Sequence, residues 1–170
     1  VALSGASGML GTALRKALSA RQTPALQLVR GTPASSSQLA WNPAVEPAIA
    51  DGEALEGLGA AIHLSGASVA GHRWTTAYKQ ELAASRVQST QALARLLASL
   101  RNPPQILLVA SAVGWYGDRG EELLDESSPA GTGFLAELCK QWEAAARPAA
   151  DAGIPVVNLR LGVVLGRGEG

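Results

Sequence analysis

Short apolar runs alternate along the chain with segments in which apolar residues recur every three or four positions. The runs predict strands at residues 1–4, 25–29, 39–41, 60–64, 106–110 and 155–159. The spaced apolar residues predict helices at about 10–18, 75–100 and 134–150. An Ala/Glu-rich stretch at 44–57 predicts a further, short helix. Because the strands are apolar throughout, they are typical of a parallel sheet covered on both faces. Strand and helix follow one another in turn, so the pattern predicts an α/β fold with a doubly wound parallel sheet.

Composition narrows the class of protein. The 170 residues carry 14 basic and 14 acidic side chains, and no basic stripe points to nucleic acid. No apolar stretch is long enough to suggest a membrane span. The single cysteine, Cys139, excludes an internal disulfide and fits a reducing, cytoplasmic setting. No histidines or cysteines stand at ligand spacing, so we expect no metal.

A glycine-rich loop joins the first predicted strand to the first predicted helix. Gly5 allows a tight turn, Gly8 lets the backbone approach a pyrophosphate, and Gly11 lets the helix pack closely. The N-terminus of the helix offers free N–H groups and a positive dipole end to phosphates. The loop therefore predicts a dinucleotide site, and a purely structural glycine turn is the alternative. Its sequence is Gly5-Ala6-Ser7-Gly8-Met9-Leu10-Gly11.

The residue that follows the second predicted strand bears on the choice of cofactor. NAD-binding proteins usually carry an acidic residue here, which accepts hydrogen bonds from the ribose hydroxyls. This chain has Arg30, whose guanidinium attracts a 2′-phosphate. Arg30 therefore favours NADP over NAD, and a solvated surface arginine is the alternative.

With this loop in place, the chain resembles the extended short-chain dehydrogenase/reductases, which bind NAD(P) in a Rossmann fold. The segment His63-Leu64-Ser65-Gly66 is similar to their second cofactor-contacting turn. Two further segments, Ala110-Ser111-Ala112 and Trp115-Tyr116-Gly117, are similar to the region near their catalytic serine.

Other motifs resemble a narrower, atypical subgroup, the sugar-nucleotide-epimerase-like proteins often labelled epimerase family protein. The resemblance covers essentially the whole chain, and it implies NADP as cofactor and a small-molecule substrate such as a nucleotide sugar. It also implies that Arg30, Leu64, Ser65, Gly66, Glu81 and Arg86 contact or frame the cofactor. The motifs are Arg73-Trp74, Lys79, Glu81, Ser85-Arg86, Tyr116 to Gly120, Trp142 to Ala145, and Arg160 to Gly166.

The usual proton-transfer residues of the larger family are missing. Ordinary members use a serine, a tyrosine and a lysine four residues after the tyrosine. The serine position falls on Ala112, next to Ser111. The Tyr-x-x-x-Lys positions fall on Phe134 and Leu138 or, one residue later, on Leu135 and Cys139.

Tyr116 and Ser111 are the candidate substitutes in catalysis. Tyr116 follows the fifth predicted strand, at the edge where ligands bind in open α/β sheets. Its hydroxyl could carry a proton, and a tyrosine packed beneath the loop is the alternative. Lys79 and Lys140 are candidate neighbouring cations. His63, at the end of a buried strand, is expected to be a hydrogen-bonded core residue.

Two functions stay open at this point. The first is an NADP-dependent epimerase or oxidoreductase, and the second is a non-catalytic NADP(H)-binding or redox-sensing module. Extended family members carry a smaller substrate-binding region after the last strand seen here. We therefore expect residues 1–170 to be one dinucleotide-binding domain of a longer protein. The oligomeric state, including a homodimer, also stays open.

Overall fold

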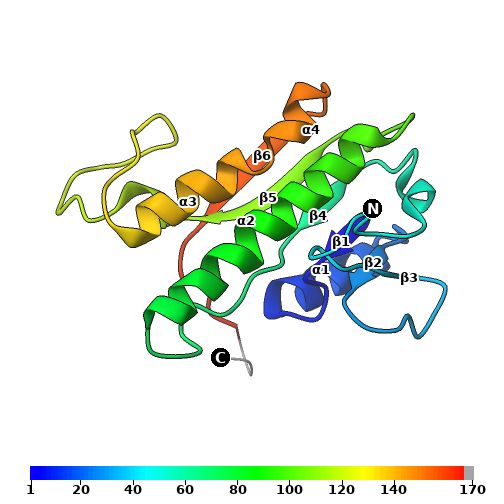
Figure 1. Cartoon of the computed structure of the whole chain (residues 1–170), viewed down its shortest axis with the longest axis horizontal. Helices are drawn as coiled ribbons and strands as arrows, with labels where there is room; N and C mark the ends of the chain where they lie inside the picture. Colours follow the sequence, from blue (N-terminus) through cyan, green and yellow to red (C-terminus); the bar gives the residue numbers. More distant parts are fainter. Residues whose placement is uncertain (167–170) are drawn as a thin grey trace.

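The fold is a six-stranded parallel sheet with helices on both faces, as the computed structural model of residues 1–166 shows (Figure 1). The strand order is β3-β2-β1-β4-β5-β6, and every neighbouring pair is parallel. The predicted doubly wound Rossmann-type sheet is confirmed. The strands are β1 (Ala2–Ser4), β2 (Leu26–Val29), β3 (Gln38–Ala40), β4 (Ala61–His63), β5 (Leu107–Ala112) and β6 (Val156–Leu161).

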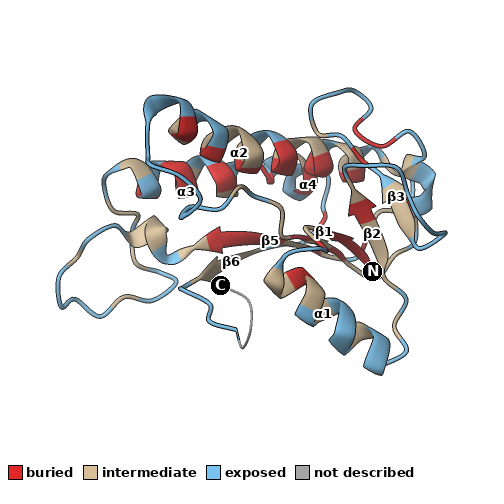
Figure 2. Cartoon of the chain, turned by 90° about the horizontal axis from the view of Figure 1, so that it is seen from below, coloured by how far each residue is buried: buried red, intermediate tan, exposed pale blue. Residues whose placement is uncertain are grey.

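The helices divide between the two faces of the sheet. Figure 2 shows α1 (Met9–Ala20) on one face, and α2 (Thr76–Ser99), α3 (Phe134–Ala144) and α4 (Arg147–Asp151) on the other. Right-handed crossovers explain the division, because the chain leaves β1 toward β2 and later continues in the opposite direction from β4 to β6. The change of direction lies between β1 and β4, the place where open α/β sheets bind ligands.

The core lies between the sheet and the three-helix layer. Leu82, Leu93 and Leu97 recur along one side of α2 and are at most 1% exposed. Leu93 and Leu97 pack in one cluster with Leu107 and Val109 of β5. The Thr75 hydroxyl accepts a hydrogen bond from the Tyr78 amide and so caps the start of α2. This packing fixes the direction of α2 and therefore the turn that precedes it.

Two helix predictions are wrong in part. Over residues 44–57 only a short 3₁₀ helix, Gly52–Leu55, is present, since Pro47 has no amide donor and Gly57 has a positive φ of 70°. The predicted helix over residues 134–150 is divided into α3 and α4. Pro148 explains the break, because its ring would clash with the carbonyl of Ala144 in a continuous helix.

Among residues 1–166, no helix is long and apolar enough to cross a membrane. Residues 167–170 lie outside the described part of the chain.

Candidate cofactor and active site

The glycine loop packs directly against the turn that follows β4. Gly5 has a positive φ of 69°, and an ideal Cβ there would lie 2.7 Å from both the carbonyl carbon and the carbonyl oxygen of Leu64. The Leu64 amide in turn donates to the carbonyl of Ser4. The two turns that the motifs lead us to expect at a cofactor are therefore in backbone contact at the carboxyl edge of the sheet.

The three loop glycines differ in what surrounds them. A Cβ on Gly11 would overlap the carbonyl oxygen of Gly5, so α1 packs on the loop itself. A Cβ on Gly8 would meet only the Gly5 carbonyl oxygen, at 3.5 Å. The fold therefore needs Gly5 and Gly11, whereas at Gly8 it leaves room for a side chain.

Gly8 is also the N-cap of α1 and makes no side-chain cap hydrogen bond. Ser7 and Gly8 are exposed, and Met9 and Leu10 in the first turn are half-buried. The first turn holds no acidic residue. The helix therefore presents its N–H groups and positive dipole end at an open surface, as an anion site requires.

Arg30 reaches the same edge from β2. It follows Val29 directly, and β2 pairs in parallel with β1, which ends at the glycine loop. Its side chain is exposed, and within residues 1–166 it makes no hydrogen bond or ion pair. The guanidinium is thus at the edge that sequence reasoning predicted.

The turn after β4 is held from behind by α2. The Ala67 amide donates to the Ser85 hydroxyl at 3.1 Å, and the Arg86 guanidinium donates to the Ala67 carbonyl at 2.8 Å. A Cβ on Gly66 would lie 3.3 Å from the Arg86 guanidinium carbon. Burial lowers the pKa of Arg86. The Arg86 side chain therefore supports the turn by binding the backbone of the turn.

The other candidate cofactor-binding residues near this turn are half-buried or exposed. Leu64 and Ser65 are half-buried, and Gly66 is exposed. Glu81 lies one helical turn before Ser85, exposed, and makes no hydrogen bond or ion pair within the described chain.

His63 joins three elements through buried hydrogen bonds. Its Nδ1 atom lies 2.6 Å from the Ser4 hydroxyl, and its Nε2 atom lies 3.1 Å from the Ser89 hydroxyl. Because Ser89 donates its own hydrogen to the Ser85 carbonyl, the ring must donate from Nε2 and accept at Nδ1. Burial lowers the pKa of His63 to about 4. The prediction of a hydrogen-bonded core histidine is confirmed.

Ser111 and Tyr116 belong to one polar network at the ends of β5 and β6. The Ser111 hydroxyl, 3% exposed, donates to the Glu143 carboxylate at 2.7 Å. Ser111 and Arg160 are register partners, and Arg160 forks onto both carboxylate oxygens of Glu143, at 2.9 and 3.1 Å. Arg160 also donates to the Tyr116 hydroxyl at 3.2 Å. Hydrogen bonding to Glu143 raises the pKa of Arg160.

Glu143 and Arg160 stand out in the sequence only as parts of the family motifs. The one local signal is an arginine within an apolar strand. The register of β6 on β5, together with the position of α3, brings the two residues to Ser111. The lysines considered as neighbours of Tyr116 have other contacts. Lys140 pairs with Glu137 at 3.3 Å, and Lys79 lies 5.0 Å from the centre of the Phe134 ring.

Two pairs of α3 residues align with the usual tyrosine and lysine, and the structure shows which pair faces the end of β5. The Cys139 thiol donates to the Ala112 carbonyl at 3.7 Å, and a Cβ on Gly114 would lie 3.2 Å from Leu135 Cβ. The other aligned pair, Phe134 and Leu138, packs away from this end, against Tyr78 and Leu82 of α2. Burial raises the pKa of Cys139, as expected for a packed thiol. Leu135 and Cys139 are therefore the aligned pair that lies beside the end of β5.

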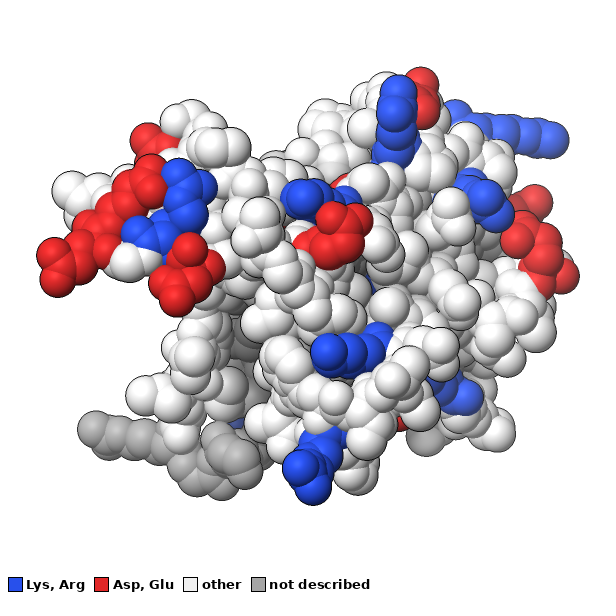
Figure 3. Space-filling view, turned by 60° about the vertical axis from the view of Figure 1, so that its left-hand side comes forward, with Lys and Arg blue, Asp and Glu red and all other residues white. Residues whose placement is uncertain are grey.

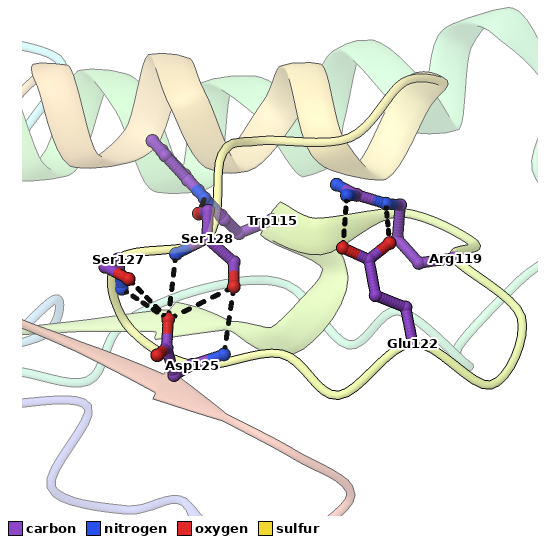
Figure 4. Close-up of polar contacts among 6 residues, drawn as sticks. All are labelled: Trp115, Arg119, Glu122, Asp125, Ser127 and Ser128. Carbon is purple, nitrogen blue, oxygen red and sulfur yellow. Dashed lines mark hydrogen bonds and ion pairs between the residues drawn. The ribbon is translucent and has the colours of Figure 1, made fainter.

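An acidic loop, residues 117–131, follows Tyr116, and Arg160 donates to its Glu126 carbonyl. Figure 4 shows polar contacts within this loop. Arg119 forks onto Glu122, with both hydrogen bonds at 2.8 Å. Hydrogen bonds from Ser127 and Ser128 lower the pKa of Asp125. Figure 3 shows acidic side chains gathered on one projecting part of the surface. Within residues 1–166, no three acidic, histidine or cysteine side chains are grouped as a metal site would need.

Sequence relatives share most of this chain. The model of the NAD dependent epimerase/dehydratase family matches residues 1–170. An epimerase family protein of Mycobacterium bovis, Mb2239, is 44% identical over 165 residues, which are 97% of this chain and 54% of the relative. The human epimerase family protein SDR39U1 is 34% identical over 173 residues, covering all of this chain and 56% of its own.

Solved structures agree with the fold. The crystal structure of human SDR39U1 (isoform 2) with NADPH has a TM-score of 0.86 and 31% identity, covering 99% of this chain and 55% of the human one. A nucleoside-diphosphate sugar epimerase from Corynebacterium glutamicum has a TM-score of 0.82 and 37% identity, covering 97% of this chain and 34% of its own. The chain spans about half the length of the curated relatives it matches. Since the family model covers it from end to end, the chain belongs to the NAD-dependent epimerase/dehydratase family.

Proposed function

We propose that this chain forms the cofactor-binding part of an NADP(H)-dependent epimerase or oxidoreductase acting on a small molecule such as a nucleotide sugar. One observation carries the proposal: the uncapped start of α1 opens at Gly8, a glycine that the fold does not require. A glycine without a packing reason fits a loop that a pyrophosphate approaches closely. The NADPH bound to human SDR39U1 and the name of the Corynebacterium relative support the cofactor and the substrate class.

The cofactor would lie along the carboxyl edge from β2 to β4. The glycine loop, with Gly5, Ser7, Gly8, Met9, Leu10 and Gly11, would hold the pyrophosphate, and Arg30 would bind the 2′-phosphate. The turn with Leu64, Ser65 and Gly66 would border the cofactor, framed by Glu81 and Arg86. When bound, the nicotinamide supplies or accepts a hydride.

The residues proposed for proton transfer are Tyr116 and Ser111. Tyr116 carries a hydroxyl at the end of β5 and would move a proton at that atom. Ser111 would act differently, because its hydrogen already goes to Glu143 within a buried network. We therefore assign proton transfer to Tyr116 and a supporting role to Ser111.

Gly8→Ala in the full-length protein tests the cofactor site. Since the structure leaves space for this methyl group, unfolding should be unchanged, while the Kd for NADPH should rise at least about tenfold. Gly59→Ala is the matched control, because a Cβ there meets nothing within 4 Å and the residue precedes β4 at the opposite edge. Equal NADPH affinity in both variants would mean that the loop is only a structural turn.

Turnover is tested separately. The full-length protein is incubated with NADP(H) and a panel of nucleotide sugars, and both absorbance of the cofactor and exchange of sugar isomers are followed. Tyr116→Phe should abolish the activity found. Unchanged rates in this variant would remove Tyr116 from the mechanism.

A non-catalytic NADP(H)-binding or redox-sensing module is the second candidate. The absence of a tyrosine and a lysine from both pairs that align with the usual Tyr-x-x-x-Lys positions supports it, and of these pairs Leu135 and Cys139 lie beside the end of β5. This candidate predicts NADPH binding without turnover of any substrate in the panel. Substrate turnover by the wild-type protein eliminates it.

A further inference from the structure

Nearly all hydrogen-bond donors of Arg160 are engaged within the protein. A guanidinium has five N–H groups. Two of those of Arg160 go to the Glu143 carboxylate, and the Nη1 atom donates to both the Tyr116 hydroxyl and the Glu126 carbonyl. Arg160 therefore connects a buried carboxylate to the edge of the site.

The same guanidinium packs against aromatic rings. Its central carbon lies 3.9 Å from the centre of the Trp115 ring and 5.3 Å from that of Tyr116. The side chains of Arg160 and Glu143 are only 18% and 9% exposed. A forked, largely buried ion pair that also stacks on a ring has one geometry, because the planar guanidinium cannot satisfy these contacts in another.

The acidic loop begins and ends at the residues that Arg160 holds. The Gly131 amide donates to the Trp115 carbonyl at 2.9 Å, and a Cβ on Gly131 would overlap the carbonyl oxygen of Tyr116. Arg160 also binds the Glu126 carbonyl inside the loop. Arg160 is therefore one side chain that contacts both Tyr116 and the interior of the loop.

We propose that Glu143 and Arg160 are positioning residues that orient the Tyr116 hydroxyl, so that an arginine on β6 serves where related enzymes use a lysine on the helix. This rests on the proposed function, in which Tyr116 transfers the proton. Arg160 donates to the phenol oxygen, so the phenol hydrogen points away from it and is available to a substrate oxygen. After that hydrogen has left, the oxygen and its negative charge remain 3.2 Å from the guanidinium nitrogen.

Conservative variants of the full-length protein test this assignment. Arg160→Lys keeps the charge but loses the fork, and Glu143→Gln keeps an acceptor for Ser111 but loses the charge. Both should lower kcat by about a hundredfold, since small misplacements of a reacting group have effects of that size. The KM and the Kd for NADPH should stay within about twofold. Tyr116→Phe should lower kcat by a smaller factor in the Arg160→Lys background than in the wild type, because Arg160 acts through Tyr116.

Two exposed pairs supply the controls. Arg147→Lys and Glu137→Gln alter ion pairs on α4 and α3 that lie away from the network. Neither should change kcat. A general fall in stability would instead raise the KM and the NADPH Kd together with the loss of kcat, and that pattern would overturn the assignment.

Hydrogen exchange of the amides from Tyr116 to Gly131 gives a readout that needs no substrate. Exchange should accelerate in Arg160→Lys and Glu143→Gln but not in the two controls. Unchanged exchange in both network variants would overturn the inference even if the enzyme is active. Faster exchange together with a wild-type protein that turns over nothing would leave the positioning role standing and reject the proposed function.

Discussion

The backbone of Gly5 lies against the backbone of Leu64, so closely that a Cβ on Gly5 would be 2.7 Å from the Leu64 carbonyl carbon. The loop after β1 and the turn after β4 therefore meet without any side chain between them. The residues on both sides of this contact are those assigned to the cofactor.

Gly5→Ala should destabilise the protein by about 1–3 kcal/mol, because the positive φ strains an alanine and its methyl group meets backbone. Chemical denaturation of the variant measures this loss. Gly8→Ala is the control and should unfold like the wild type, since its methyl group has space. Equal stability of the two variants would contradict the packing described for Gly5.

Arg30→Ala should weaken NADPH binding by about tenfold to a hundredfold, the usual effect of losing charge-assisted hydrogen bonds. NADH binding should stay unchanged, because NADH has no 2′-phosphate. Fluorescence titration of the full-length protein with both cofactors measures the difference. Parallel losses for both cofactors would show that Arg30 does not read the 2′-phosphate, and no loss would leave it a solvated surface residue.

Acid should destabilise the fold through His63. The folded pKa of about 4 lies below the ordinary value of 6.5, so between these values the unfolded chain binds more protons. The contribution of His63 is therefore complete above pH 6.5 and decreases as the pH falls to 4, by roughly 3 kcal/mol.

Urea unfolding at pH 7, 5.5 and 4 measures this dependence. His63→Asn should lose stability at pH 7 and then show a flatter profile than the wild type over the same range. His72→Asn is the control, since His72 is exposed and outside the Ser4–Ser89 relay. Profiles of equal slope in the wild type and His63→Asn would disprove the assignment.

Trp142 should contribute through its ring nitrogen as well as its packing. The buried indole donates to the Thr90 hydroxyl at 3.0 Å, between α3 and α2. Thr90→Val should leave that N–H without a partner and cost about 1–3 kcal/mol. Adding Trp142→Phe should then cost less than it does in the wild type, because no unpaired donor remains. Strictly additive losses in denaturation would argue against a direct interaction.

Much of the fold was predictable, and the failures have local causes. The six strands were predicted to within about two residues, because buried parallel strands are continuous apolar runs. The short helix expected within residues 44–57 is only the 3₁₀ helix Gly52–Leu55, which lies between Pro47 and Gly57. There the burial of Ile49 and Leu55 comes from tertiary packing and not from a helical face.

In the candidate site, too, one part was predictable from the sequence and another was not. The spacing of Gly5, Gly8 and Gly11 determined the dinucleotide loop, since a tight turn, an open approach and close helix packing each need a missing side chain at a given place. Nothing local linked Glu143 to Ser111, 32 residues away, or to Arg160, 17 residues away. Only the register of β5 beside β6, with α3 above them, brought these groups together. The sequence thus determined the glycine loop through backbone constraints, while the tertiary structure decided the polar network, because its contacts join residues that are distant in the chain.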